Sequence, residues 1–309
     1  MSDSVLEVEA AGIRFQNPIL LAAGTAAYGR ELAGVMPLEE LGGFVTKAVS
    51  LEPRHGAPAP RVADFDGGMI NAVGLANPGV DAVLARDLPW IAEHVRRARV
   101  LVNVVGHEAH EFGEVVARLD GAAGFQGFEL NVSCPNVKKG GLEFGADPAA
   151  LGELIRGARA ATRKPLFVKL SPTLPKVGDT ARAAVDAGAD GISVINTIPG
   201  LAIDVERRRP MLGFGSGGVS GPGLLAVGVL ATRRVREAVS VPIIGVGGVQ
   251  RAEDALQYII AGANLVAVGT AAMADPKLPA RLVRHLAEWS ARHGVERLAE
   301  LTGTLEWPT

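Results

Sequence analysis

Residues 187–194 read AGADGISV and residues 261–268 read AGANLVAV. Each stretch follows a segment whose apolar residues recur every three or four positions, which is typical of a helix. In each, a glycine stands where that helix would end, and an apolar run typical of a strand comes next. The two stretches therefore look like copies of one helix-to-strand unit, and such repetition favours a closed barrel over an open sheet.

The same alternation extends through the rest of the chain. Short apolar runs typical of strands lie at residues 18–23, 43–48, 100–105, 128–132, 166–170, 191–196, 242–246 and 264–268. Stretches with helical spacing lie at residues 81–97, 111–119, 148–162, 177–187, 224–239, 252–261 and 277–292. Alternating strands and helices predict parallel βαβ units. Eight such strands in 309 residues predict a single (β/α)8 TIM-barrel domain over residues 1–309.

Two shorter segments fall outside this alternation. Residues 4–15 predict an N-terminal hairpin that plugs one end of the barrel. Residues 61–72, around Asp66-Gly67-Gly68, predict an inserted hairpin. This insertion follows the second strand, so we expect it, with other loops, at the C-terminal face of the barrel.

Composition limits the partners and the compartment. Lysine and arginine number 31 against 33 acidic residues, for a net charge of −2, and no basic stripe predicts nucleic-acid binding. Cys134 is the only cysteine, which excludes an internal disulfide and predicts a reducing cytoplasm. The acidic N-terminus and the lack of about 18 consecutive apolar residues predict neither a signal peptide nor a membrane anchor.

The carboxyl ends of the expected strands are unusually polar, and in this architecture active sites lie at those ends. In chain order they carry Gly24-Thr25, Lys47, Asn103, Asn131, Lys169, Asn196-Thr197, Gly247-Gly248 and Gly269-Thr270. A single lysine or asparagine in such a place is more often a turn former. Eight polar ends at one mouth, however, predict a binding site.

Glycines follow the last two expected strands. Gly245, Gly247, Gly248 and Gly269-Thr270 lie where barrels commonly hold a phosphate. Because glycine lets backbone N–H groups approach an anion, we expect a phosphorylated ligand there. The alternative is that these residues only form tight strand-to-helix turns.

The fourth expected strand leads into residues 131–136, NVSCPN, and then into residues 137–141, VKKGG, which we expect to form a mobile loop. This order places the Cys134 thiol over the mouth. A lone cysteine is more often an inert apolar residue, but this one stands in a polar turn. Its chemistry leaves both a general base and a nucleophile open.

The stretch NVSCPN followed by VKKGG resembles the active-site loop of the class 1 dihydroorotate dehydrogenases, most closely the catalytic subunit of the 1B type. The similarity extends over nearly the whole chain. Further matching stretches are Asn17-Pro18, Thr46-Lys47-Ala48, Glu52-Pro53-Arg54, residues 71–79 (NAVGLANPG), residues 168–172 (VKLSP), Ile195-Asn196-Thr197, Gly217-Gly218 and Ser220-Gly221-Pro222.

The resemblance implies an FMN-dependent enzyme that oxidises dihydroorotate to orotate in pyrimidine biosynthesis. Cys134 would be the base that removes the C5 proton while the C6 hydride passes to the flavin, and Lys169 would stabilise the reduced ring. The implied substrate residues are Lys47, Asn71, Val73, Gly74, Leu75, Asn131, Asn136, Asn196 and Thr197. The implied FMN residues are Ala23, Gly24, Thr25, Lys47, Ala48, Asn103, Asn131, Lys169, Ile195, Gly221, Gly247, Gly248, Gly269 and Thr270.

The resemblance also implies an assembly and an electron acceptor. In the 1B type, a homodimer of catalytic subunits is flanked by partner subunits that carry FAD and a 2Fe-2S cluster and reduce NAD, whereas the 1A type uses fumarate without a partner. With one cysteine, this chain cannot hold the cluster itself. The rival interpretations are another FMN barrel acting on a pyrimidine, such as a dihydropyrimidine dehydrogenase-like or dihydrouridine synthase-like reductase, and a non-catalytic flavin-binding assembly subunit.

Three other patterns have structural interpretations. His107 and His110 are three residues apart rather than four, so no metal site is predicted. Residues 213–218, GFGSGG, fit a dinucleotide-loop pattern but follow no strand of a βαβ unit, and we expect a flexible loop over the flavin. Residues 207–209, all arginine, predict a solvated loop, with partner docking as the alternative.

Overall fold

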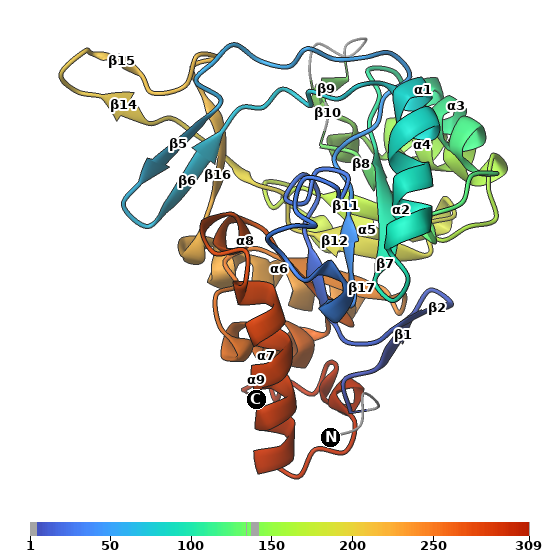
Figure 1. The fold of residues 1–309 in the computed structure, drawn as a ribbon, viewed down its shortest axis with the longest axis vertical. Helices are drawn as coiled ribbons and strands as arrows, with labels where there is room; N and C mark the ends of the chain where they lie inside the picture. The colour runs from blue at the N-terminus through green and yellow to red at the C-terminus, as the bar shows by residue number, and fades with distance from the viewer. Residues whose placement is uncertain (1–4, 134, 137–141, 309) are drawn as a thin grey trace.

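The computed structural model describes residues 5–133, 135–136 and 142–308. At its centre, eight parallel strands form a closed barrel in which the last strand pairs with the first (Figure 1). The strands are β3 (Ile19–Leu21), β4 (Gly43–Val45), β7 (Arg99–Val104), β8 (Gly127–Asn131), β11 (Leu166–Leu170), β12 (Gly191–Val194), β17 (Ile243–Val246) and β18 (Leu265–Val268). Each overlaps one stretch expected from the sequence, so the (β/α)8 barrel is confirmed.

Helices surround the strands. They are α1 (Val80–Ala82), the π-helical segment η3 (Val83–Asp87), α2 (Leu88–His94), α3 (Ala109–Leu119), α4 (Pro148–Ala160), α5 (Val177–Asp186), α6 (Leu225–Ala238), α7 (Ala252–Ala261), α8 (Thr270–Ala274) and α9 (Leu278–Arg292). The 3-10 turns are η2 (Leu38–Glu40), η5 (Phe144–Ala146), η6 (Pro222–Leu224) and η7 (Leu298–Leu301). The expected helix at 81–97 is not regular, because the wide π turn stands just before Pro89, whose missing N–H and bulky ring disturb an α-helix. None of the helices in the described residues is long and apolar enough to span a membrane.

The first repeated stretch joins α5 to β12 through Gly188, which has a φ of 111°. The Arg159 side chain passes so close that a Cβ on Gly188 would lie 2.9 Å from its Cγ. Arg159 then donates to Asp190 Oδ2 at 2.7 Å, and the same oxygen accepts the N–H of Leu166, the first residue of β11, at 2.9 Å. One side chain therefore ties a helix to the starts of two neighbouring strands.

The second repeated stretch, between α7 and β18, is built the same way. Gly262 has a φ of 125°, and a Cβ there would lie 2.5 Å from the Cγ of Arg236. Asn264 Oδ1 accepts from Arg236 at 3.1 Å and from the N–H of Ile243, at the start of β17, at 3.1 Å. The copies inferred from the sequence are therefore equivalent in three dimensions, with Asn264 in the place of Asp190.

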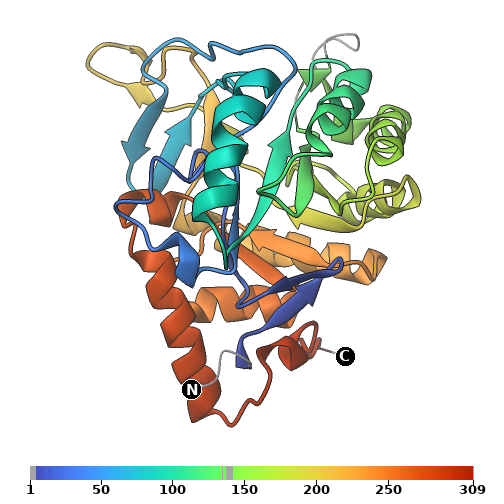
Figure 2. The ribbon, with the colours of Figure 1, turned by 45° about the vertical axis from the view of Figure 1, so that its right-hand side comes forward.

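The N-terminal hairpin closes one end of the barrel, as expected. It consists of β1 (Val8–Ala10) and β2 (Ile13–Phe15). Val8, Ala10, Ile13 and Phe15 are buried against side chains of the barrel interior, namely Leu20, Val45, Leu101, Phe167, Ile244 and Leu265. Figures 1 and 2 place this hairpin at the lower end of the barrel, away from the long insertions.

The inserted hairpin is also confirmed, as β5 (Val62–Phe65) and β6 (Gly68–Asn71). It forms an antiparallel sheet with β16 (Gly217–Ser220) and β13 (Ile198–Gly200), in the order β13-β16-β6-β5. With the hairpin of β14 (Ile203–Asp204) and β15 (Arg209–Pro210), this sheet forms a projection that we call the arm (Figure 1).

The arm corrects one expectation. Residues 213–218 do not form a loop throughout, because Gly217 and Gly218 belong to β16 and pair with β13 and β6. The pair β9 (Pro135–Asn136) and β10 (Leu142–Glu143) lies at the same end of the barrel as the arm (Figure 1). The insertions thus gather at the carboxyl ends of the strands.

Candidate active site

Contacts between side chains join several of the expected substrate residues. Asn131 ends β8, and its Oδ1 accepts from Nδ2 of Asn196, which follows β12, at 3.3 Å. Asn196 Oδ1 in turn accepts the N–H of Thr197 at 2.8 Å. Thr197 packs directly on Gly218, where a Cβ would clash with its Oγ1, and the Gly218 carbonyl accepts from Asn71 Nδ2 at 3.2 Å. Residues from four separate parts of the chain therefore meet at the mouth.

Residues 73–75 follow Asn71 and turn sharply. Gly74 and Leu75 have φ values of 69° and 55°, in the region that favours glycine. A leucine held there costs roughly 1–3 kcal/mol and needs support from its surroundings. Buried Asn77 supplies it, because its Nδ2 donates to the Leu75 carbonyl at 2.8 Å and its Oδ1 accepts the N–H of Gly79 at 2.9 Å. Asn77 belongs to the matching stretch NAVGLANPG, but the sequence alone does not predict its supporting role.

Lys47 follows β4 and is half-buried. Its backbone N–H donates to the Ala27 carbonyl at 2.7 Å. Within the described part of the chain, its ammonium group has no hydrogen bond or ion pair. A half-buried cation without a partner is suited to an anionic ligand such as a carboxylate.

Below the mouth, the barrel interior holds a polar layer of Asn103, Glu129, Lys169 and Ser193. Asn103 pairs with Glu129 across β7 and β8, and Lys169 pairs with Ser193 across β11 and β12. Glu129 Oε1 accepts from Asn103 Nδ2 at 2.8 Å and lies 3.9 Å from Lys169 Nζ. Sequence reasoning selected Asn103 and Lys169 but missed Glu129, because a glutamate inside a strand carries no local signal of burial.

The glycines after β17 and β18 form what we call the glycine cradle, Gly247, Gly248 and Gly269. Their backbone N–H groups donate to no atom of the described residues. The Gly247 carbonyl is held from behind by the Tyr258 hydroxyl at 2.8 Å, and burial raises the pKa of Tyr258, which keeps it a neutral donor. Free N–H groups on a fixed backbone suit a phosphate, so the residues present fit the phosphorylated cofactor that the sequence implies.

The other expected FMN residues lie around the same cradle. Thr270 and Ser220, the residue before buried Gly221, are hydrogen-bonded through their hydroxyl groups at 2.8 Å. A Cβ on Gly269 would lie 3.9 Å from Thr25 Oγ1, so residues 23–25 at the end of β3 adjoin the end of β18. Ile195 lies beside Gly247, where a Cβ would be 3.3 Å from its Cγ1. Ala48 is buried, and its carbonyl accepts from the Tyr28 hydroxyl at 2.9 Å.

Part of the expected site lies outside the described residues. Cys134 and residues 137–141 are not described, and neither is the side chain of Asn136. Their roles therefore stay predictions. The described residues on either side of Cys134 are Ser133 and those of β9, which come shortly after Asn131 in the chain.

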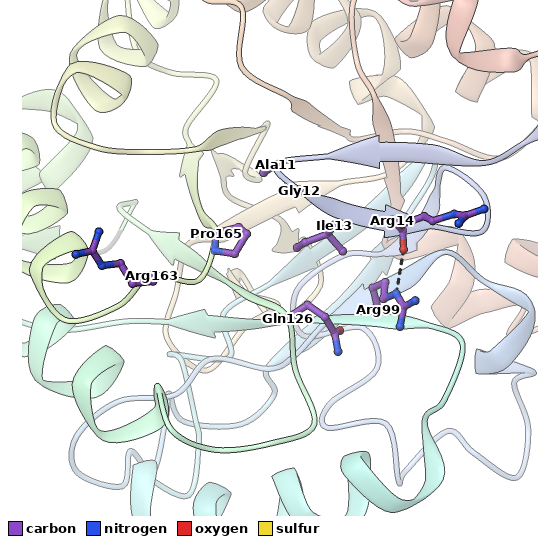
Figure 3. A pocket seen from close by; sticks show the side chains of 8 residues that line it. All are labelled: Ala11, Gly12, Ile13, Arg14, Arg99, Gln126, Arg163 and Pro165. Carbon is purple, nitrogen blue, oxygen red and sulfur yellow. Dashed lines mark hydrogen bonds between the residues drawn. The ribbon is translucent and has the colours of Figure 1, made fainter.

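A cavity of about 480 Å³ lies at the opposite end of the barrel, between the N-terminal hairpin and the strand starts (Figure 3). Its basic side chains are Arg14, Arg99 and Arg163. Arg99 donates to the Arg14 carbonyl at 2.9 Å, and the Arg14 guanidinium pairs with Glu7. The active sites of this fold lie at the other end of the barrel.

Comparison with known proteins agrees with the geometry. The chain matches the family model described as dihydroorotate dehydrogenase over residues 5–289. It is 45% identical over 301 residues to a Geobacter sp. (strain M21) protein named dihydroorotate dehydrogenase B (NAD(+)), catalytic subunit, covering 97% of this chain and 98% of that protein. It is 44% identical over 296 residues to a Solibacter usitatus (strain Ellin6076) protein provisionally named dihydroorotate dehydrogenase A (fumarate), covering 96% and 97%.

A solved structure supports the fold. The dihydroorotate dehydrogenase of Eimeria tenella in complex with ferulenol aligns with a TM-score of 0.82 over 97% of this chain and 88% of that chain, at 24% identity. The family match over residues 5–289 and the 45% identity over 97% of the chain show the family as well as the fold. This chain belongs to the dihydroorotate dehydrogenase family.

Proposed function

We propose that this chain, as one FMN-binding barrel domain, oxidises (S)-dihydroorotate to orotate in pyrimidine biosynthesis. The observation that carries the proposal is the set of contacts linking Asn71, Asn131, Asn196 and Thr197, at the same end of the barrel as the glycine cradle with its free N–H groups. Asparagine offers both a donor and an acceptor, which matches a ring edged by amide N–H groups and carbonyls. The family membership supports the same reaction.

Each group of residues has a proposed role. The asparagines, Thr197 and residues 73–75 hold the pyrimidine ring, and the free ammonium of Lys47 pairs with the substrate carboxylate. Cys134 removes the proton from C5, and bound FMN supplies the chemistry that accepts the hydride from C6. Lys169 stabilises the negative charge that develops on the reduced ring.

The glycine cradle and its neighbours bind the cofactor. Its N–H groups are proposed to hold the FMN phosphate, together with Gly221 and Thr270. Residues 23–25, Lys47, Ala48, Asn103, Asn131 and Ile195 are proposed to line the rest of the cofactor. Asn136 is proposed to contact the substrate next to Cys134.

The test of this function is anaerobic addition of dihydroorotate to the purified, FMN-loaded protein. We expect rapid bleaching of the oxidised flavin spectrum with formation of orotate. A protein that binds FMN but keeps its flavin oxidised would contradict the substrate assignment, leaving a flavin barrel with another substrate or an assembly role.

We further propose that a cytoplasmic homodimer of this chain passes electrons to NAD through a partner subunit with FAD and a 2Fe-2S cluster. The Geobacter relative is named as a catalytic subunit, which supports a separate partner. The arm exposes apolar side chains, namely Val62, Phe65, Leu201, Ile203, Val205 and Phe214. Gathered exposed apolar side chains are typical of interaction surfaces.

The assembly can be checked by light scattering during size-exclusion chromatography. We expect the chain alone to elute with the mass of a homodimer, and the chain co-expressed with a candidate iron–sulfur flavoprotein to elute as a larger complex that reduces NAD with dihydroorotate. A flavin-loaded protein that stays monomeric would contradict the homodimer, and reduction of fumarate without a partner would support the 1A type instead.

A further inference from the structure

Glu129 is the one carboxylate in the polar layer, and its side chain is almost fully buried. It is 1% exposed, on the strand that ends two residues later at Asn131. Its contacts are Asn103 Nδ2 at 2.8 Å and Lys169 Nζ at 3.9 Å. A buried charge is costly unless it is paired, so retaining a glutamate here calls for a reason beyond packing.

The contact with Asn103 fixes the direction of an amide. Asn103 turns its NH2 group toward Glu129, whose Oε1 accepts the hydrogen bond. Its Oδ1 is then left as an acceptor, and no described residue donates to it. Without the carboxylate, both orientations of the amide would be open.

The contact with Lys169 fixes a cation at the same level. Lys169 is 6% exposed, and its ammonium group has no other hydrogen bond or ion pair within the described residues. Glu129 thus stands between one fixed acceptor, Asn103 Oδ1, and one fixed donor, Lys169 Nζ. Both residues are among those we assign to the flavin.

We propose that Glu129 is a positioning residue of the flavin site, which sets the orientation of Asn103 and the place of Lys169 and partly neutralises the lysine charge. This inference rests on the proposed function only in assigning Asn103 and Lys169 to FMN. Glu129 acts through these two neighbours, so its loss should change the affinity for FMN and the reduction potential of the bound flavin.

The test is Glu129→Gln, which keeps the shape but removes the charge and allows the Asn103 amide to turn. Because a turned Asn103 amide would no longer present its Oδ1 to the cofactor, we expect the Kd for FMN, measured by fluorescence titration of the apoprotein, to rise roughly 10- to 100-fold. Loss of a negative charge also favours the reduced, more negative flavin. We expect the midpoint potential of the bound flavin to become more positive by about 30 mV. This shift equals a tenfold gain in the affinity for reduced FMN relative to oxidised FMN.

Asp190→Asn is the matched control. Asp190 is also a carboxylate paired with a cation and a hydrogen-bond donor, but at the amino end of the barrel, and the equivalent position in the other repeat is Asn264. Its FMN affinity and midpoint potential should match those of the native chain. Values for Glu129→Gln that equal those of Asp190→Asn would overturn the proposal.

If Glu129→Gln does not fold, the pair can be removed together, because apolar replacement of a buried ion pair is often tolerated. Glu129→Leu with Lys169→Met should then bind FMN more weakly than Lys169→Met alone, since only the double variant frees the Asn103 amide. Equal affinities would overturn the proposal. The FMN affinity and the midpoint potential can be measured even if dihydroorotate fails to bleach the native flavin. That failure would contradict the proposed function but not the role of Glu129.

Discussion

Replacing Cys134 with alanine is expected to slow anaerobic reduction of the bound flavin by dihydroorotate about 100- to 10,000-fold, the usual contribution of a general base. The variant lacks the proposed base for the C5 proton, so hydride transfer from C6 must proceed without its help. Stopped-flow absorbance at the oxidised flavin band measures the rate. Binding of orotate, followed by its perturbation of the flavin spectrum, should be retained because the asparagines are unchanged.

Cys134→Ser separates the size of the side chain from its acidity. A hydroxyl is a much weaker acid than a thiol, so the serine variant should remain slower than the native enzyme near neutral pH and become faster as the pH rises. If the alanine variant were reduced as fast as the native chain, the proton would have to go to another group. The assignment of Cys134 as base would then be wrong, although the barrel and the FMN site would stand.

Gly248→Ala is expected to weaken FMN binding about 100-fold, or about 2.7 kcal/mol. Gly248 has a φ of 74°, which strains any residue with a Cβ. The added Cβ would also lie 2.7 Å from the Cα of Leu225, the first residue of α6. Relief of this clash must shift the backbone of the glycine cradle, so its N–H groups would no longer converge on a phosphate. Titration of the apoprotein with FMN, followed by flavin fluorescence, measures the loss.

Gly223→Ala supplies the control for that measurement. Gly223 lies in η6, close in sequence to Leu225, but a Cβ there would meet no atom within 4 Å. Its FMN affinity should stay within about twofold of the native value. Equal affinities for the native chain and Gly248→Ala would show that the glycine cradle does not hold the phosphate.

Local patterns determined the barrel and most of the mouth. Apolar runs alternate with stretches of helical spacing, and this alternation identifies each strand. A parallel strand buried on both faces is a continuous apolar run, whereas a helix buried on one face has apolar residues every three or four positions. The repeated helix-to-strand unit is identified by its glycine and by the polar residue two positions later, Asp190 or Asn264. Both copies join the helix end to the next strand in the same way. Residues such as Asn131 and Lys169 follow from the rule that carboxyl ends carry function.

Partners distant in the sequence decided the rest. Gly217 and Gly218 have little strand propensity of their own, yet they form a strand because β6, from a separate insertion, supplies the hydrogen-bond partners. Asn77, which supports the positive φ of Leu75, is itself held by Ser50, 27 residues earlier in the chain, because its Nδ2 donates to Ser50 Oγ at 2.8 Å.

The sequence by itself therefore determined the fold, the glycine-rich ends of the last two strands and the presence of Cys134 in a polar turn. Only the tertiary structure placed Glu129 between Asn103 and Lys169, because barrel closure and strand register decide which inward-facing side chains meet. Barrel closure and strand register both depend on the whole chain and are not encoded in any short stretch of residues.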